Sequence, residues 1–178
     1  MMSRLFTKAR LIGLALAAFI VAIDQWLKHY IIGPLNLRTV GNIELLPFFD
    51  FTYVENRGVS LGMLEATSME TRWLLVAGTA VIALVVFIWM MRERLLGDII
   101  GLSMILGGAL GNIYDRYMWG YVIDYADFHF GTFRPFLIFN VADACITIGV
   151  VIILVRSFFF SEKEEDDTDT SQMRPAES

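Results

Sequence analysis

The stretch from Trp73 to Met91 contains no charged residue, and it constrains the fold more than any other part of the chain. An apolar run of this length crosses the hydrocarbon core of a bilayer as one helix. Three further segments, at about residues 11–31, 98–117 and 135–155, are apolar and long enough to do the same. Hydrophobic residues make up 56% of the 178 residues, more than is usual in a soluble domain. The sequence therefore predicts an all-α membrane protein with four transmembrane helices.

The N-terminal segment also has features of a secretory signal peptide. A basic start, with Arg4 and Arg10, precedes an apolar run in which residues 15–17 offer an A-x-A cleavage motif. The apolar character continues to Ile32, however, which is longer than a signal-peptide core. We therefore expect an uncleaved first transmembrane helix at about residues 11–31.

The region between the first two helices has a different periodicity. Apolar and polar residues alternate around Ile43 and Leu45 and again over residues 49–53, which is the pattern of half-buried strands. Turn-forming glycine and asparagine residues divide the region. We predict a small extracytoplasmic β-sheet at about residues 40–64 that lies on the membrane surface with aromatic side chains directed toward lipid. An irregular loop is the alternative interpretation.

Four spans place both chain termini on the same side of the membrane. The short segments 1–10 and 92–94 are densely basic, and such segments stay in the cytoplasm. Residues 1–160 are then expected to form one membrane domain, followed by a disordered acidic cytoplasmic tail at 161–178. Nothing in the charge pattern indicates binding to nucleic acid.

Polar residues gather at the opposite, outer end of the predicted bundle. They are Asp24, Lys28, Asn112, Asp115, Arg116, Asp124, Asn140 and Asp143. Those within one helix are spaced three or four residues apart and therefore share a helix face. Gly107 and Gly111 form a GxxxG face, which lets the third helix approach a neighbour closely. Because ionisable groups at membrane depth are costly, this cluster indicates a functional site that opens to the outer leaflet.

Asp124 and Asp143 are the candidate catalytic pair. Two carboxylates at short range do not both ionise readily, so one keeps a proton while the other acts as a base. Such a pair hydrolyses a peptide bond by activating water and supplying a proton to the departing amine. We expect Asp143 to hold the proton, because a helix interior is drier than the loop around Asp124. From the spacing alone, a structural charge network explains the residues equally well.

Three motifs resemble those of a known family. The three stretches are GGALGNIYDR from Gly107, GYVIDY from Gly120 and FNVADA from Phe139. Together with the Asn-x-Gly at residues 56–58, Asp24 and Lys28, they are similar to the lipoprotein signal peptidase (signal peptidase II) family, over residues 11–155. The resemblance implies a four-span aspartic endopeptidase of the bacterial cytoplasmic (inner) membrane, with its active site toward the periplasmic face. It also implies the substrate, a diacylglyceryl-modified prolipoprotein that is cleaved just before the modified cysteine.

The resemblance further implies roles for individual residues. Asp124 and Asp143 match the catalytic aspartates of the family. The positions that match its active-site surround are Asn56, Gly58, Asn112, Arg116 and Asn140, and those that match its other polar motif positions are Asp24, Lys28 and Asp115. Tyr125 departs from the pattern, which more often has phenylalanine there, and so do Val59 and Leu61 in the loop. These departures concern the loop more than the two aspartates, so they affect how the substrate fits more than how the bond is cleaved.

Other functions have weaker support in the sequence. With two histidines and no HExxH motif, a zinc peptidase is not indicated, and we expect neither metal nor cofactor. A small membrane transporter or channel subunit that uses the embedded charges is the alternative function, although transporters place such charges near the membrane midplane. A purely structural membrane partner is a further alternative. The expected partners are the lipid-modified prolipoprotein and membrane lipid, and the protein is expected to act as a monomer.

Overall fold

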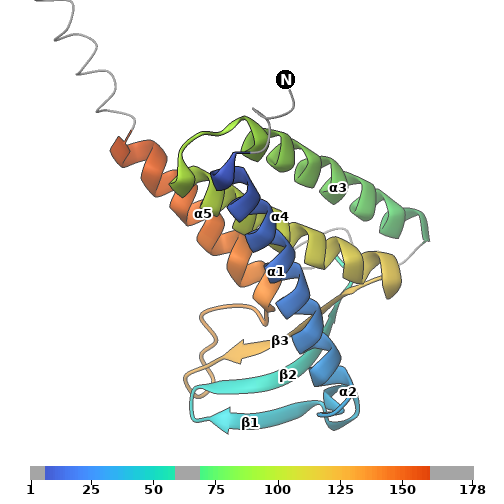
Figure 1. The fold of residues 1–178 in the computed structure, drawn as a ribbon. Coiled ribbons are helices and arrows are strands. Elements are labelled where there is room, and N and C mark those ends of the chain that lie inside the picture. The colour runs from blue at the N-terminus through green and yellow to red at the C-terminus, as the bar shows by residue number, and fades with distance from the viewer. Residues whose placement is uncertain (1–6, 59–68, 161–178) are drawn as a thin grey trace, which may run out of the picture.

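The computed structural model describes residues 7–58 and 69–160. Within these residues, four helices are long and apolar enough to cross a membrane, and with a small sheet they confirm the predicted fold class. These helices are α1 (Lys8–Ile32), α3 (Met69–Arg92), α4 (Leu96–Met118) and α5 (Val141–Phe160). A short helix, α2 (Leu37–Val40), leads from α1 to the sheet, which lies at one end of the bundle (Figure 1). The predicted tail and residues 59–64 of the predicted sheet lie outside the described residues.

The central helix of the bundle is α4, which packs against α1, α3 and α5 and is the most buried of the four candidate spans. Glycine residues permit this packing. A Cβ added at Gly107 would come within 2.8 Å of the Ala17 carbonyl oxygen in α1. A Cβ added at Gly108 would overlap the carbonyl oxygen of Ala142 in α5. The glycine face thus sets the distance between α4 and both neighbouring helices.

Gly108→Ala is expected to destabilise the protein by about 1–3 kcal/mol, because the added methyl group must displace the first turn of α5. Thermal unfolding in detergent measures the change. Gly78→Ala in α3 is the matched control, since a Cβ at Gly78 meets nothing within 4 Å. Equal unfolding temperatures for the two variants would show that α4 and α5 are not closely packed at Gly108.

The sheet is antiparallel, with the strand order β1 (Asn42–Leu46), β2 (Phe49–Asn56) and β3 (Val122–Phe128). The first two strands lie in the region predicted to form a sheet. The third is absent from the prediction, which treats Asp124 as a loop residue. The first six residues of β3 are all buried, so its sequence lacks the apolar–polar alternation that indicates a half-buried strand. Asp124 is therefore held in a strand, opposite Val54 of β2.

A buried apolar cluster fastens β3 to the end of α1. Ile31 at the end of α1 and Leu37 of α2 are both fully buried, and they pack with Ile123 and Tyr125 of β3. Burial of side chains of this size contributes about 1.5–3 kcal/mol each. The strand that carries Asp124 is thus fixed against the first helix.

The last helix, α5, begins at Val141, later than the start near residue 135 that the apolar run predicts. Phe139 precedes the helix as extended backbone and pairs with Ala126 of β3: its N–H donates at 3.1 Å, and its carbonyl accepts at 2.8 Å. The extended segment before α5 is as apolar as the helix itself. Hydropathy alone therefore places the start of the helix too early. Asp143 consequently lies in the first turn of α5 and not deep within the helix.

Candidate active site

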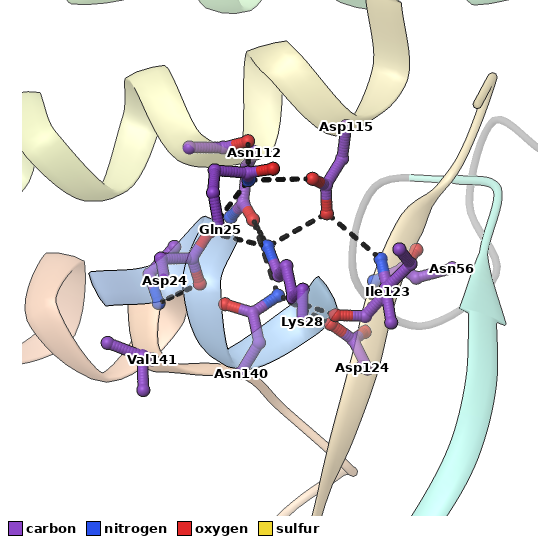
Figure 2. Close-up of polar contacts among 12 residues, drawn as sticks. Asp24, Gln25, Lys28, Asn56, Asn112, Asp115, Ile123, Asp124, Asn140 and Val141 are labelled. Carbon is purple, nitrogen blue, oxygen red and sulfur yellow. Dashed lines mark hydrogen bonds and ion pairs between the residues drawn. The ribbon is translucent and has the colours of Figure 1, made fainter. Parts of the chain in front are cut away.

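A buried lysine lies between two carboxylates from different helices (Figure 2). Lys28 Nζ is 2.8 Å from Asp24 Oδ2, one turn earlier in α1, and 2.8 Å from Asp115 Oδ2 of α4. The three side chains are at most 2% exposed. Because a buried charge is costly unless it is paired, this group, here called the lysine network, allows α1 and α4 to pack at this point.

The lysine network also holds the backbone on both sides of the site. Asp24 Oδ1 accepts the N–H of Ala142 at 3.1 Å, and Asp115 Oδ2 accepts the N–H of Ile123 at 3.2 Å. Ala142 and Ile123 are the residues immediately before the two predicted catalytic aspartates. The two carboxylates beside the lysine therefore fix the chain next to each member of the predicted pair.

A glutamine that the sequence analysis does not identify belongs to the lysine network. Gln25 Nε2 donates to Asp115 Oδ1 at 2.8 Å and to Asp24 Oδ2 at 3.1 Å. Its N–H groups bridge two like charges. Gln25 precedes Lys28 by three residues and so shares a helix face with it, but the sequence signal is weak because glutamine is uncharged.

Asp124 on β3 is 2% exposed, and both of its oxygens accept hydrogen bonds. Oδ1 accepts from Asn140 Nδ2 at 2.7 Å, and Oδ2 accepts from Asn56 Nδ2 at 3.0 Å. Burial raises the pKa of Asp124 to about 7, and the nearby negative charge of Asp143 acts in the same direction. The two asparagine hydrogen bonds oppose this rise in pKa. Asp124 therefore titrates near neutral pH.

Asp143 is held by the start of its own helix. Its Oδ1 accepts from Asn112 Nδ2 at 2.8 Å, and its Oδ2 accepts the backbone N–H of Asn140 at 3.3 Å. In return, Asn140 Oδ1 accepts the backbone N–H of Asp143 at 2.9 Å. This reciprocal pair is a helix capping box, so the cap of α5 also fixes the carboxylate of Asp143.

Asn140 connects the two aspartates. Because its Oδ1 accepts from the first turn of α5, its Nδ2 is free to donate to Asp124 on β3. The same Nδ2 lies 3.3 Å from the Oδ1 of Asn112, whose own Nδ2 donates to Asp143. Asn140 is fully buried. One asparagine thus places residues that are distant in the sequence in a single hydrogen-bonded unit.

The expectation that Asp143 is the drier aspartate is wrong. Asp124 is 2% exposed, whereas Asp143 is only partly buried and lines a groove. The reason lies in the two local structures. Asp124 belongs to a buried strand and not to a loop, and Asp143 lies in the first turn of α5 and not in the helix interior.

Arg116 is connected to Asn56 through the backbone of Gly58. Arg116 Nη2 donates to the Gly58 carbonyl at 3.0 Å, and the Gly58 N–H donates to Asn56 Oδ1 at 3.2 Å. The second bond orients the Asn56 amide so that its Nδ2 donates to Asp124. Arg116 Nε is buried and has no hydrogen-bond partner within the part of the chain that the structure describes. Asn56, Gly58 and Arg116 thus form a chain of hydrogen bonds that ends at Asp124.

Two apolar grooves lie beside the pair. The first has a volume of about 330 Å³ and is lined by Phe136, Leu137, Phe139, Asp143, Ala144, Thr147 and Ile148. The second has a volume of about 420 Å³ and extends between the sheet and α5, where Phe51, Tyr125 and Asn140 contribute to its wall. Phe139 and Ala144 line both grooves. Apolar surface therefore leads to the polar site from two directions.

The chemical groups of the site are carboxylates, amides and basic side chains. Within residues 7–58 and 69–160, no three or more histidine, cysteine, aspartate or glutamate side chains are arranged to hold a metal ion. The groups present can exchange protons with water and donate hydrogen bonds to a developing oxyanion. This chemistry suits hydrolysis.

Comparison with known proteins finds relatives over most of the chain. The family described as Signal peptidase (SPase) II matches residues 16–159. Relatives named Lipoprotein signal peptidase from Sphingopyxis alaskensis and Rhizorhabdus wittichii are 52% and 51% identical, over 85% and 86% of this chain and 87% and 89% of theirs. A solved structure described as a bacterial membrane enzyme is 26% identical, has a TM-score of 0.71 and covers 94% of each chain. The chain therefore belongs to the signal peptidase II family and is a multi-pass bacterial membrane peptidase.

Proposed function

We propose that this protein removes the signal peptide of diacylglyceryl-modified prolipoproteins by cleaving just before the modified cysteine, with Asp124 and Asp143 as its catalytic pair. The observation that carries the proposal is the position of Asn140. Its side chain donates to Asp124 at 2.7 Å and caps the first turn of the helix that bears Asp143. Two carboxylates held in one hydrogen-bonded unit, with Asp124 buried and Asp143 partly exposed, suit aspartic hydrolysis.

In the proposed reaction, ionised Asp143 takes a proton from a water molecule, whose oxygen attacks the carbonyl carbon of the scissile bond. Protonated Asp124 donates a hydrogen bond to the carbonyl oxygen as negative charge develops there. When the tetrahedral intermediate collapses, the C–N bond breaks and the proton on Asp143 passes to the departing amine. The proton that Asp124 gives to the carbonyl oxygen returns to Asp124 as the carbonyl re-forms, and the pair is back in its starting state.

The assignment of the proton to Asp124 follows from the surroundings of the two carboxylates. Asp124 is the more buried, and its pKa of about 7 keeps it largely protonated below neutral pH. Asp143 is partly exposed, and its oxygens accept N–H donors from Asn112 and from the backbone of Asn140. Each carboxylate accepts two N–H donors, so the difference in burial supports the assignment.

The grooves supply places for the apolar parts of the substrate. The first groove follows α5 from Asp143 past Thr147, so a signal helix in it lies along a membrane span with its end at the pair. The second groove reaches Asn140 and takes the acyl chains of the modified cysteine. The basic turn at residues 92–94 lies at the opposite end of the bundle and is cytoplasmic, so the site faces the periplasm.

A cleavage assay tests the proposed function. The purified protein in detergent is mixed with a lipid-modified preprolipoprotein or with the same precursor lacking the lipid, and the products are identified by mass. We expect cleavage of the modified precursor alone, with the modified cysteine as the new N-terminal residue. Cleavage at another bond, or equal kcat/KM for both precursors, would contradict the proposal.

The pH dependence of kcat/KM tests the proton assignment. Activity should fall as the pH rises through about 7, because Asp124, whose pKa is raised to about 7, then loses the proton that the reaction needs. The hydrogen bond from Asn56 lowers the pKa of Asp124, so Asn56→Ala should move the alkaline limb to higher pH. An alkaline limb that does not move, or that moves to lower pH, would argue against Asp124 as the proton holder.

A further inference from the structure

Tyr125 follows Asp124 on β3, and the reaction described above gives its hydroxyl group no role. The side chain is 2% exposed, and its hydroxyl oxygen accepts the backbone N–H of Val141 at 3.3 Å. Val141 is the first residue of α5, two positions before Asp143. The hydrogen bond therefore connects the residue after one catalytic aspartate to the first turn that carries the other.

The first turn of a helix needs acceptors from elsewhere, because its first N–H groups have no partner within the helix. In α5 three side chains supply them. The backbone N–H of Val141 donates to the Tyr125 hydroxyl, that of Ala142 to Asp24 Oδ1, and that of Asp143 to Asn140 Oδ1. The acceptor from Tyr125 is the one that comes from the strand bearing Asp124. It therefore links the two catalytic elements directly.

The ring of Tyr125 cannot follow α5 if the helix moves. It packs edge to face against Phe51 of β2 with a centroid distance of 5.9 Å, and it belongs to the buried cluster that fastens β3 to α1. A side chain locked in this way holds its hydroxyl oxygen at a fixed place relative to β3. The hydrogen bond from the Val141 N–H consequently restrains the first turn of α5 relative to β3.

We propose that the Tyr125 hydroxyl is a positioning group, which holds the first turn of α5 against β3 and so keeps Asp143 in reach of Asp124. The inference rests on the proposed function, because it concerns the same reaction. The charged groups around the pair are Asp24 and Lys28 of α1 and Asp115 and Arg116 of α4. All of them remain in Tyr125→Phe, which removes the hydroxyl group and keeps the ring that lines the second groove.

Tyr125→Phe removes one oxygen atom and keeps the packed ring. We expect kcat for the lipid-modified precursor to fall about fivefold with KM unchanged, as for the loss of one hydrogen bond that orients a catalytic group. The alkaline limb of the pH profile should move to lower pH, because a less firmly held Asp143 raises the pKa of Asp124 less. Hydrogen exchange at the Val141 amide should become faster.

Tyr53→Phe is the matched control. The Tyr53 hydroxyl lies on β2 and, among the described residues, its hydrogen-bond partners are the hydroxyl of Tyr121 and Glu55 Oε1, each at 3.4 Å, and not the pair or α5. This variant should keep the wild-type kcat and pH profile. An unchanged kcat and profile in Tyr125→Phe would overturn the proposal. A lower kcat with an unshifted alkaline limb would also overturn it, since loss of folded enzyme alone gives that result. If the wild type did not cut the precursor, the proposed function itself would be wrong.

Discussion

Asp124→Asn and Asp143→Asn should each lower kcat by about 10²–10⁴-fold, the usual contribution of a positioned acid or base. Either change leaves the site without a group that can both hold and release the proton. An amide at position 124 gives no general acid, and an amide at position 143 cannot take a proton from water. The measurement is single-turnover cleavage of the lipid-modified precursor by folded variants in detergent.

Asp127→Asn is the control that separates catalysis from the effect of altering a buried carboxylate on the same strand. Asp127 is 1% exposed on β3, and its oxygens accept from Arg134 Nε at 3.0 and 3.2 Å. Its replacement should lower stability and preserve the rate per folded molecule. If Asp127→Asn were as inactive as Asp124→Asn, or if Asp143→Asn kept its activity, the catalytic assignment would fail.

Lys28→Met is expected to destabilise the fold by about 3–5 kcal/mol, the cost of leaving a buried charge without its partner. The lysine network places Lys28 Nζ 2.8 Å from each of Asp24 and Asp115, and methionine removes this charge while keeping much of the side-chain volume. Activity should also be lost, because the same carboxylates hold the backbone beside each catalytic residue. Unfolding in detergent, monitored by circular dichroism, measures the change in stability.

A matched control for the lysine is an exposed ion pair of the same chain. Arg38 Nη2 lies 3.2 Å from Glu55 Oε1, and its side chain is 58% exposed. Arg38→Met should change stability by no more than about 1 kcal/mol. Adding Asp115→Asn to Lys28→Met should restore part of the stability, since one buried negative charge is removed. Equal stability of Lys28→Met and Arg38→Met would show that the lysine is not essential to the fold.

The four helices and the polar residues near the pair follow from local features of the sequence. An uncharged apolar run has one stable form in a bilayer, and this identifies a span such as α3 without information from elsewhere in the chain. The spacing of Asp24 and Lys28 likewise identifies a shared helix face, and the structure places the two side chains in an ion pair.

What the sequence does not predict depends on contacts between distant segments. The first six residues of β3 are all buried, so its sequence lacks the apolar–polar alternation of a half-buried strand. The role of Gln25 becomes visible only when the structure places its side chain between two carboxylates. The start of α5 is decided by the pairing of Phe139 with Ala126, which hydropathy does not register. The expectation that Asp143 is the drier aspartate depends on that boundary, because an earlier start of α5 would place Asp143 inside the helix.

The hydrogen bond from Ala142 to Asp24 joins residues 118 positions apart, near the two ends of the described chain. During synthesis the first span leaves the ribosome long before the last. The Asp24 carboxylate therefore cannot accept the N–H of Ala142 until translation is nearly complete. We therefore expect the nascent chain to be inactive until α5 has been made, and removal of α1 to leave the first turn of α5 without this acceptor.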